Sequence, residues 1–317
     1  MTKKPLGRSG ISIAPLALGG NVFGWTIDKA ASFSVLDAFV DFGFDLVDTA
    51  NIYSTWVPGH KGGESETIIG EWLKAGGKRN KIVLATKVGM PMGDGSKGLK
   101  KANILRSLED SLKRLQTDHV DLYQSHQDDP QTPLEETLSA YDELIKSGKV
   151  RAIGASNYSA ARLAEALHVS KTKHLPAYVS LQPEYNLYAR KKFEEAREPL
   201  CLEHGLGVIS YYSLASGFLT GKYRSKADLT QSKRGGGIGE KYLNDRGMKI
   251  LAALDDVAKA HHTTPAVIAL AWLIQRKSVT APIASATSTK QLAELVKSAE
   301  VKLTAGQVAQ LDSASAG

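Results

Sequence analysis

Residues 82–125 contain the pattern that decides the fold class. Two short apolar runs, IVLAT (Ile82–Thr86) and VDLYQS (Val120–Ser125), flank the longer stretch NILRSLEDSLKRL (Asn103–Leu115). The short runs have the length and composition of buried strands. The longer stretch repeats apolar residues with a helical period and leaves Arg114 off the apolar stripe, toward water. Strand, helix and strand in this order predict one unit of a parallel sheet covered by helices.

Strand-like runs recur along the whole chain and alternate with helical stretches. There are eight of them: Ala14–Leu18, Phe44–Val47, Ile82–Thr86, Val120–Ser125, Val150–Gly154, Tyr178–Gln182, Gly207–Tyr211 and Val279–Ala284. Eight strands, each followed by helical sequence, predict the α/β class and a closed (β/α)8 TIM barrel. Turn signals at Leu6-Gly7 and Ser9-Gly10 predict a short N-terminal hairpin that caps the barrel bottom. Because no linker divides the chain, we expect residues 1–317 to form a single domain.

Two helix starts carry capping signals. Thr132 with Glu135 three residues later predicts a capping box, and Pro133 between them suits the first helical turn. Ser288 with Gln291 repeats the pattern after the eighth strand. We therefore expect both helices to begin at these residues.

Residues 217–241 differ from the rest of the chain. They include the run GGGIG and several basic residues, with little periodicity. This composition predicts a mobile loop, and long loops of such barrels commonly serve the active site. Its basic residues, Lys222, Arg224, Lys233 and Arg234, are candidates to close over the phosphates of a bound ligand.

Composition excludes several classes of protein. The chain has 317 residues, of which 42% are hydrophobic, so the core needs neither disulfides nor metals. Cys201 is the single cysteine, which excludes a disulfide framework and four-cysteine zinc sites and favours a reducing, cytoplasmic compartment. No apolar run approaches the about 18 residues of a membrane span. The net charge of +7 is scattered, which argues against nucleic acid as a partner and equally suits a polyanionic small molecule.

Four side chains of complementary chemistry follow the second, third and fourth strands. They are Asp48, Tyr53, Lys87 and His126. Because catalytic groups of such barrels come from the C-terminal ends of different strands, we expect all four at one mouth. A phenol has a pKa of about 10 and is a poor acid at neutral pH unless a cation stabilises its anion.

The four residue types together indicate a site that polarises and protonates a carbonyl oxygen. Lys87 can supply the cation that the phenol needs, and Asp48 can keep that lysine charged. These side chains cannot supply a hydride, so reduction requires a hydride donor such as a nicotinamide. Trp25 and Trp56 lie in the loops after the first two strands and are candidate walls of the substrate site.

Longer motifs carry a family resemblance. They are Asp48-Thr49-Ala50 with Tyr53, Lys87, Asp121–His126, Gly154–Asn157, Gln182–Asn186, Tyr211–Leu214, Gly217–Lys222 and the segment Pro282–Leu292. In this order and over nearly the whole chain, the sequence resembles the aldo-keto reductases. The resemblance implies reversible hydride transfer between NADP(H), with NAD(H) as the alternative, and an aldehyde, ketone or alcohol. It implies no metal.

The resemblance also implies roles for individual residues. Tyr53 would be the general acid in reduction and the general base in oxidation, with its pKa lowered by Lys87. Asp48 would pair with Lys87, and His126 would orient the carbonyl. The implied cofactor contacts are Ser156, Asn157 and Gln182 for the nicotinamide carboxamide, Tyr211 for stacking on the ring, and Ser213, Leu214, Gly217, Lys222, Ser285, Thr287 and Gln291.

Two departures from the family pattern bear on these roles. Ser285 and Gln291 occupy positions where the best-known members carry a lysine and an arginine for the 2′-phosphate, which leaves the choice between NADPH and NADH open. Tyr212-Ser213 stands where many members have Ser-Pro, so the turn after the seventh strand is less rigid.

Two rival functions remain at this stage. The same fold occurs in cofactor-binding regulatory subunits of channels, which would bind NADPH with little turnover. Alternatively, Asp48 and a second carboxylate could serve a hydrolytic or isomerising barrel that needs no dinucleotide.

Overall fold

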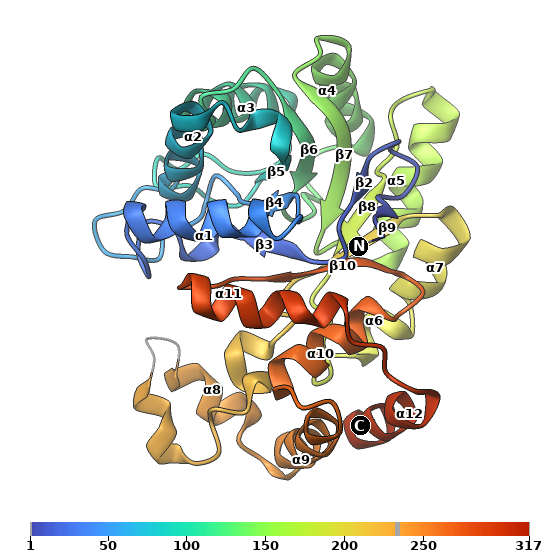
Figure 1. Cartoon of the computed structure of the whole chain (residues 1–317). Helices are drawn as coiled ribbons and strands as arrows, with labels where there is room; N and C mark the ends of the chain where they lie inside the picture. The colour runs from blue at the N-terminus through green and yellow to red at the C-terminus, as the bar shows by residue number, and fades with distance from the viewer. Residues whose placement is uncertain (1, 232–234, 317) are drawn as a thin grey trace.

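The computed structural model describes residues 2–231 and 235–316, and it contains a closed barrel of eight parallel strands (Figure 1). The strands follow the cyclic order β10-β3-β4-β5-β6-β7-β8-β9. Their bounds are β3 Ala17–Gly19, β4 Leu46–Asp48, β5 Val83–Val88, β6 Val120–Ser125, β7 Val150–Ser156, β8 Ser180–Gln182, β9 Gly207–Ser210 and β10 Val279–Ala284. The predicted (β/α)8 barrel is thus confirmed.

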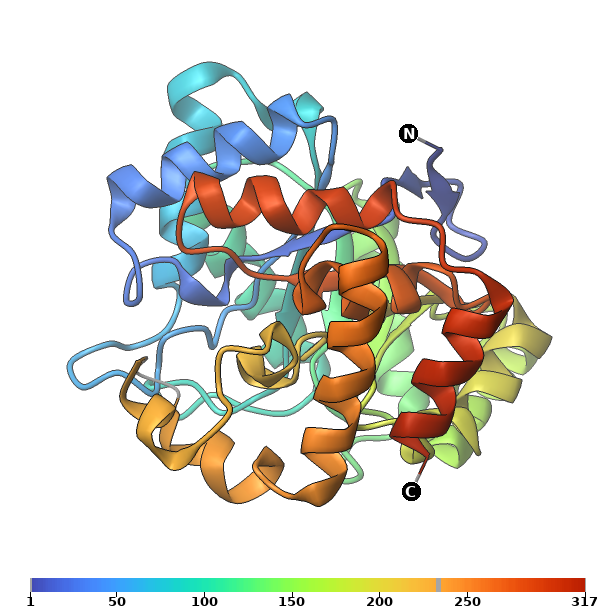
Figure 2. The same ribbon diagram turned by 60° about the horizontal axis from the view of Figure 1, so that its bottom comes forward.

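Helices surround this barrel, as both ribbon views show (Figures 1 and 2). The α-helices are α1 Lys29–Asp41, α2 Glu64–Gly76, α3 Lys101–Leu115, α4 Leu134–Lys146, α5 Ala160–Lys173, α6 Lys191–Glu194, α7 Arg197–His204, α8 Gly235–Tyr242, α9 Asp245–Ala260, α10 Pro265–Ile274, α11 Thr289–Leu295 and α12 Ala305–Ser315. Short 3-10 helices are η1 Gly20–Val22, η2 Arg79–Lys81, η3 Ala215–Thr220, η4 Lys226–Gln231 and η5 Val296–Ala299. Among the described residues, no helix combines the length and the apolar character that crossing a membrane requires.

Two strands have the predicted bounds and the other six are shifted. Val120–Ser125 and Val279–Ala284 agree with the prediction. Four strands extend further toward their C-terminal ends than predicted, and in three of them polar residues there still pair with neighbouring strands. Asp48 pairs with Ala85, Lys87 with Gln124, and Ser156 with Gln182. Three of the candidate site residues therefore belong to the rigid barrel wall.

The N-terminal hairpin closes the end of the barrel where the strands begin. Its strands are β1 Lys4–Pro5 and β2 Ser12–Ile13, which pair antiparallel. Gly7 in its turn has φ +55°, and a Cβ there would lie 2.0 Å from the carbonyl oxygen of Val179, just before β8. The apolar side chains of the hairpin join those at the lower ends of the strands in one cluster, which includes Leu6, Ile11, Ile13, Ala17, Leu46, Ala85, Leu122 and Ile209. This close packing confirms the predicted hairpin cap.

One of the two capping predictions is confirmed as an N-cap, although the Gln291 side chain accepts from the N–H of Thr287 and not from that of Ser288. The Ser288 side chain accepts a hydrogen bond from the Gln291 backbone N–H at the start of α11. The prediction for Thr132 is wrong, because α4 begins one residue later, with Pro133 as its N-cap and no side-chain cap. The Thr132 hydroxyl instead donates a hydrogen bond to the carboxylate of Asp129, at 2.7 Å.

Residues 217–241 form more regular structure than predicted. This part of the chain holds the end of η3, then η4 and most of α8. Apolar side chains spaced too widely to show a local period make a small core here, in which the rings of Phe218 and Tyr242 stack 5.3 Å apart and Ile238 and Tyr223 are buried. Long-range packing therefore orders a stretch that the sequence pattern assigns to a loop.

Candidate active site

Three of the four candidate catalytic side chains meet at the amino group of Lys87. Its Nζ lies 2.6 Å from Oδ2 of Asp48 and 2.9 Å from the hydroxyl of Tyr53. The ammonium also donates to the carbonyl oxygen of Thr49, at 2.8 Å. With 0% of Lys87 and 1% of Asp48 exposed, this ion pair lies beneath the phenol and away from solvent. The pair thus has one fixed arrangement, with the ammonium directed at Tyr53.

Asp48 is held on both carboxylate oxygens. While Oδ2 accepts from Lys87, Oδ1 accepts from the side-chain amides of Gln124, at 3.1 Å, and Gln182, at 2.9 Å. A buried carboxylate requires such partners to offset the loss of its hydration. Because its oxygens are occupied, Asp48 is suited to orienting the lysine rather than to accepting a proton from a substrate.

Burial controls the protonation state of the phenol and the imidazole. Burial raises the pKa of Tyr53 well above its usual value, and the charge of Asp48 and its hydrogen bond raise it further. Burial also lowers the pKa of His126 well below its usual range, assisted by the charge of Lys87. At neutral pH the phenol is therefore protonated and the imidazole is neutral. Burial and Asp48 thus set the direction of the Tyr53 pKa shift, and a lowering contribution from Lys87 stays a prediction.

His126 and the two candidate tryptophans lie around Tyr53. The ring centroid of Tyr53 is 6.1 Å from that of His126 and 6.1 Å from that of Trp56. Trp25 contacts Trp56 edge to face at 5.8 Å, and Trp56 is 50% exposed. Nδ1 of His126 is buried without a hydrogen-bond partner in the described part of the chain. The phenol thus lies among aromatic side chains, beside an imidazole with an unused polar atom.

Four of the predicted cofactor residues form one connected group. The Ser156 hydroxyl donates to the backbone oxygen of Gln182 at 2.9 Å, and the Asn157 amide donates to Ser156 and to the backbone oxygen of His126. The Tyr211 hydroxyl donates to Oδ1 of Asn157 at 2.7 Å. Burial, with the charge of Glu184, raises the pKa of Tyr211 to about 12, so this hydroxyl remains a donor. The group lies next to the candidate catalytic side chains, because Gln182 also contacts Asp48.

A second group of predicted cofactor residues lies after β9. The Ser213 hydroxyl is used within the turn, where it donates to the backbone oxygen of Ser210. The Leu214 carbonyl accepts from the N–H of Gly217, whose φ is +99°. A Cβ on Gly217 would find its nearest neighbour, Cε of Lys222, 3.9 Å away. This turn therefore offers open backbone beside a lysine.

The third group of predicted cofactor residues lies at the start of α11. Ser285 donates to Oδ1 of Asn21 at 2.6 Å. The side-chain oxygen of Gln291 accepts from both the N–H and the hydroxyl of Thr287. Neither Ser285 nor Gln291, the residues at the predicted 2′-phosphate positions, brings a guanidinium or an ammonium.

The basic residues predicted to close over phosphates do not form one cluster in the described part of the chain. Arg224 is committed to Asp255, with two hydrogen bonds of 2.7 and 2.8 Å. Lys233 and Arg234 lie outside the described residues. Lys222 is exposed, with its amino group 5.0 Å from the ring centroid of Tyr223.

The sequence pattern missed two groups of residues around the site. The Gln124 amide donates a hydrogen bond to Asp48. Its position as a polar residue inside a buried strand was a sequence signal that could have identified it as a site residue. Glu66 is fully buried, and its carboxylate accepts hydrogen bonds from both Thr86 and Arg114. Arg114 therefore does not simply face water as predicted. No local pattern links a residue of α2 to one of α3.

The residues present fit a nicotinamide dinucleotide. An unpartnered imidazole nitrogen lies beside the phenol, and the half-buried ring of Tyr211 lies beside the Ser156 and Asn157 side chains. Open backbone at Gly217 next to Lys222 suits a phosphate. The described residues contain no cluster of three or more side chains able to ligate a metal.

Comparison with known proteins agrees with this geometry. The sequence model of the Aldo/keto reductase family matches residues 15–316. The uncharacterized oxidoreductase YrpG of Bacillus subtilis is 37% identical over 94% of this chain and 91% of its own. A probable voltage-gated potassium channel subunit beta of Arabidopsis thaliana is 33% identical over 95% and 92%, and the aldo-keto reductase YhdN of Bacillus subtilis is 34% identical over 84% and 78%. The chain belongs to the Aldo/keto reductase family.

Proposed function

We propose that the protein reduces aldehydes or ketones with NADPH, or with NADH, and that Tyr53 is the proton donor. The observation that carries this proposal is the buried Lys87–Asp48 pair, whose ammonium points at the Tyr53 hydroxyl from 2.9 Å. A protonated phenol on such a support can give up its proton when a substrate oxygen becomes basic. The ammonium then stabilises the phenolate that remains.

In the proposed reduction, the residues act on the carbonyl oxygen. Tyr53 donates a hydrogen bond to this oxygen and transfers its proton as negative charge develops there. Burial and the nearby charge of Lys87 disfavour the protonated form of His126, so its imidazole is neutral. In this form it orients the same oxygen by a hydrogen bond. Asp48 keeps the ammonium in place throughout.

The cofactor would lie across the three residue groups described above. When bound, the reduced nicotinamide supplies the hydride that the side chains cannot supply. Ser156, Asn157 and Gln182 would hold the carboxamide and Tyr211 the ring face. Because Tyr211 already donates to Asn157, a carboxamide at that amide would replace this hydrogen bond. Ser213, Leu214, Gly217, Lys222, Ser285, Thr287 and Gln291 would hold the phosphates and the ribose.

The proposal also covers the walls of the substrate site, the number of domains and the location of the protein in the cell. Trp25 and Trp56 would flank the substrate, because they lie together beside Tyr53. We also propose that residues 1–317 form one domain, and that the protein is cytoplasmic. A hydrolytic or isomerising role for Asp48 is disfavoured, since both of its oxygens are occupied by protein donors.

One specific observation favours a second candidate function. Relatives named as potassium channel subunits beta match this chain over nearly its full length. A regulatory subunit of this fold would bind the cofactor with little turnover. The tyrosine and lysine alone do not separate this function from reduction.

A substrate panel separates the two functions. The purified protein is assayed with NADPH and, in parallel, NADH against aromatic, aliphatic and sugar aldehydes and ketones, and cofactor binding is measured by nicotinamide fluorescence. Reduction predicts cofactor consumption with several substrates. Tight binding with negligible consumption across the panel would support the regulatory function, and no binding of either cofactor would contradict both.

A further inference from the structure

The segment that follows β8, residues 183–190, is organised around one buried side chain. Asn186 is 0% exposed. Its Oδ1 accepts hydrogen bonds from the backbone N–H groups of Tyr188 and Ala189, both at 2.8 Å. Its Nδ2 donates to the backbone oxygen of Tyr212, at 2.9 Å. The side chain therefore shapes its own loop with one atom and holds the neighbouring loop, after β9, with the other.

The backbone that Asn186 holds is strained. Tyr212 has φ +51°, a left-handed conformation that a bulky residue adopts only when its surroundings enforce it. Its side chain is also 49% exposed, so apolar burial does not explain the conformation. Ala215 and Ser216 in the same turn have positive φ as well. Within the turn, the N–H of Ala215 donates to the Tyr212 oxygen at 2.6 Å, and the amide of Asn186 adds a contact to the same oxygen from outside the turn.

The turn leads directly to the proposed cofactor site. Tyr211 is tied to the same segment by its backbone, since its N–H donates to the oxygen of Pro183 at 2.9 Å and its oxygen accepts from Tyr185 at 3.4 Å. Its hydroxyl reaches Asn157, which in turn contacts the backbone of His126. Hydrogen bonds thus run from Asn186 through the Tyr211–Tyr212 turn and Asn157 to the backbone oxygen of His126.

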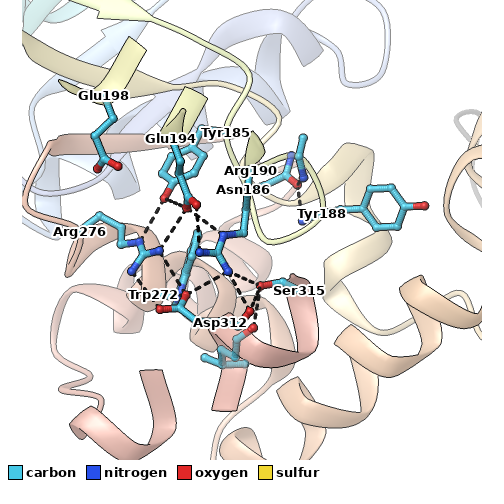
Figure 3. Close-up of polar contacts among 12 residues, drawn as sticks. Tyr185, Asn186, Tyr188, Arg190, Glu194, Glu198, Trp272, Arg276, Asp312 and Ser315 are labelled. Carbon is cyan, nitrogen blue, oxygen red and sulfur yellow. Dashed lines mark hydrogen bonds and ion pairs between the residues drawn. The ribbon is translucent and has the colours of Figure 1, made fainter. Parts of the chain in front are cut away.

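The far end of the segment is fixed to the C-terminal helix α12, and Figure 3 shows the contacts. Arg190 donates to the backbone oxygen of Asp312 and to the hydroxyl of Ser315, and it forms an ion pair with Glu194. Arg276, just after the end of α10, bridges Glu194 and Asp312. The segment is therefore held rigidly from behind, which allows Asn186 to impose a shape on the turn in front of it.

We propose that Asn186 is a positioning residue for the cofactor, which sets the Tyr211–Tyr212 turn in the shape that receives the nicotinamide ring. This inference rests on the proposed function, because it requires that the ring bind at Tyr211. It adds a residue that touches neither cofactor nor substrate. Asn186 acts through the peptide between Tyr212 and Ser213.

The direct test is the Asn186→Asp variant, with Asn244→Asp as its matched control. Aspartate keeps the size and an accepting oxygen, but it replaces the donor to Tyr212 with a second acceptor. Asn244 contacts Tyr188 of the same segment through its Nδ2 and does not reach Tyr212, and aspartate preserves its role as the N-cap of α9. We expect the NADPH Kd from nicotinamide fluorescence to rise about tenfold in Asn186→Asp and less than twofold in Asn244→Asp.

Two further readouts distinguish positioning from general loss of stability. Tyr212→Gly removes the cost of positive φ, so the turn depends less on Asn186 and the Asn186→Asp effect on Kd should shrink in the double variant. In the wild type, NADPH should slow amide exchange in residues 183–190 together with residues 211–217, a measurement that requires no variant to fold. The Kd of Asn186→Asp should rise without a change in the pH dependence of reduction, because Tyr53 keeps its partners.

The results that would overturn this inference differ from the results that would overturn the proposed function. An unchanged Kd in Asn186→Asp, additive effects in the double variant, or unchanged exchange in residues 183–190 would each overturn the positioning role while wild-type reduction stands. If the wild type binds neither NADPH nor NADH, the proposed function fails first and this inference fails with it.

Discussion

Two buried ion pairs lie on opposite faces of the same strand, β5, and they do different things. Lys87 points into the barrel mouth and binds Asp48. Its neighbour Thr86 points outward and donates at 2.6 Å to Glu66, which pairs with Arg114 between helices α2 and α3. Alternate side chains of a strand face opposite ways, so one residue step separates the site from the helical layer.

The two pairs differ in the further hydrogen-bond partners of their cations. The Lys87 ammonium is completely buried and has a phenol hydroxyl as its third partner. The Arg114 side chain is 26% exposed and otherwise contacts only the hydroxyl of Ser111 among the described side chains. A buried ion pair by itself is therefore no sign of catalysis. The titratable group placed against the cation gives the first pair its chemistry.

The largest expected effect comes from removing that group. Tyr53→Phe should lower kcat for carbonyl reduction by about 10³-fold, because general acids contribute this much. NADPH affinity should stay within a few-fold, since the phenolic proton acts on the substrate oxygen. Steady-state kinetics and fluorescence titration measure the two quantities. Substantial turnover in this variant would remove Tyr53 from the mechanism.

The second effect comes from removing the cation beneath the phenol. Lys87→Met should lower kcat by about 10²-fold, as for loss of one donor to a developing anion. It should also raise the pKa of Tyr53 still further, because the phenolate loses its hydrogen bond from the ammonium. Alcohol oxidation needs the phenolate, so its rise with pH should move to higher pH. A pH–rate profile from pH 7 to 11 tests this, and an unshifted profile would contradict it.

The pair on the outer face should affect stability instead of rate. Glu66→Gln should lower the free energy of unfolding by about 1–3 kcal/mol, because Arg114 loses its charged partner in a partly buried place. We expect kcat to change less than threefold. Urea unfolding and kinetics on the same preparation measure both, with Glu64→Gln, also on α2, as the control. A loss of activity as large as in Lys87→Met would erase the distinction between the pairs.

The smallest effect concerns the start of α11, where the described residues form no ion pair. Gln291→Arg should raise the preference for NADPH over NADH by about tenfold, because a guanidinium pairs with a 2′-phosphate. The change removes the contacts of Gln291 with Thr287, which should cost little stability. The ratio of kcat/KM values with the two cofactors measures the preference. An unchanged ratio would place the 2′-phosphate elsewhere.

Local patterns in the sequence predict the features that depend on neighbouring residues. The alternation of short apolar runs with stretches of helical period predicts the barrel, and the order of Asp48, Lys87 and His126 after successive strands predicts that they share a mouth. Strand ends are misplaced where polar residues such as Lys87 continue the ladder. Thr132 fails as a cap because Asp129 competes for its hydroxyl.

Features that depend on distant residues are missed for a physical reason. The contact of Glu66 with Arg114 joins two helices, and that of Asn186 with Tyr212 joins two loops. The raised pKa of Tyr53 is likewise a consequence of burial, which residue order does not reveal. In each case the partner or the environment is set by the closed barrel rather than by the neighbouring sequence.

The origin of the hydrogen that reaches the carbonyl carbon tests the central claim most directly. NADPH carrying deuterium at both C4 positions of the nicotinamide is used to reduce an aldehyde in ordinary water, and the alcohol is analysed by mass spectrometry. The account predicts one deuterium on the carbinol carbon, with the hydroxyl proton exchangeable and supplied through Tyr53. An alcohol without deuterium on that carbon, or no alcohol while NADPH remains bound, would contradict it.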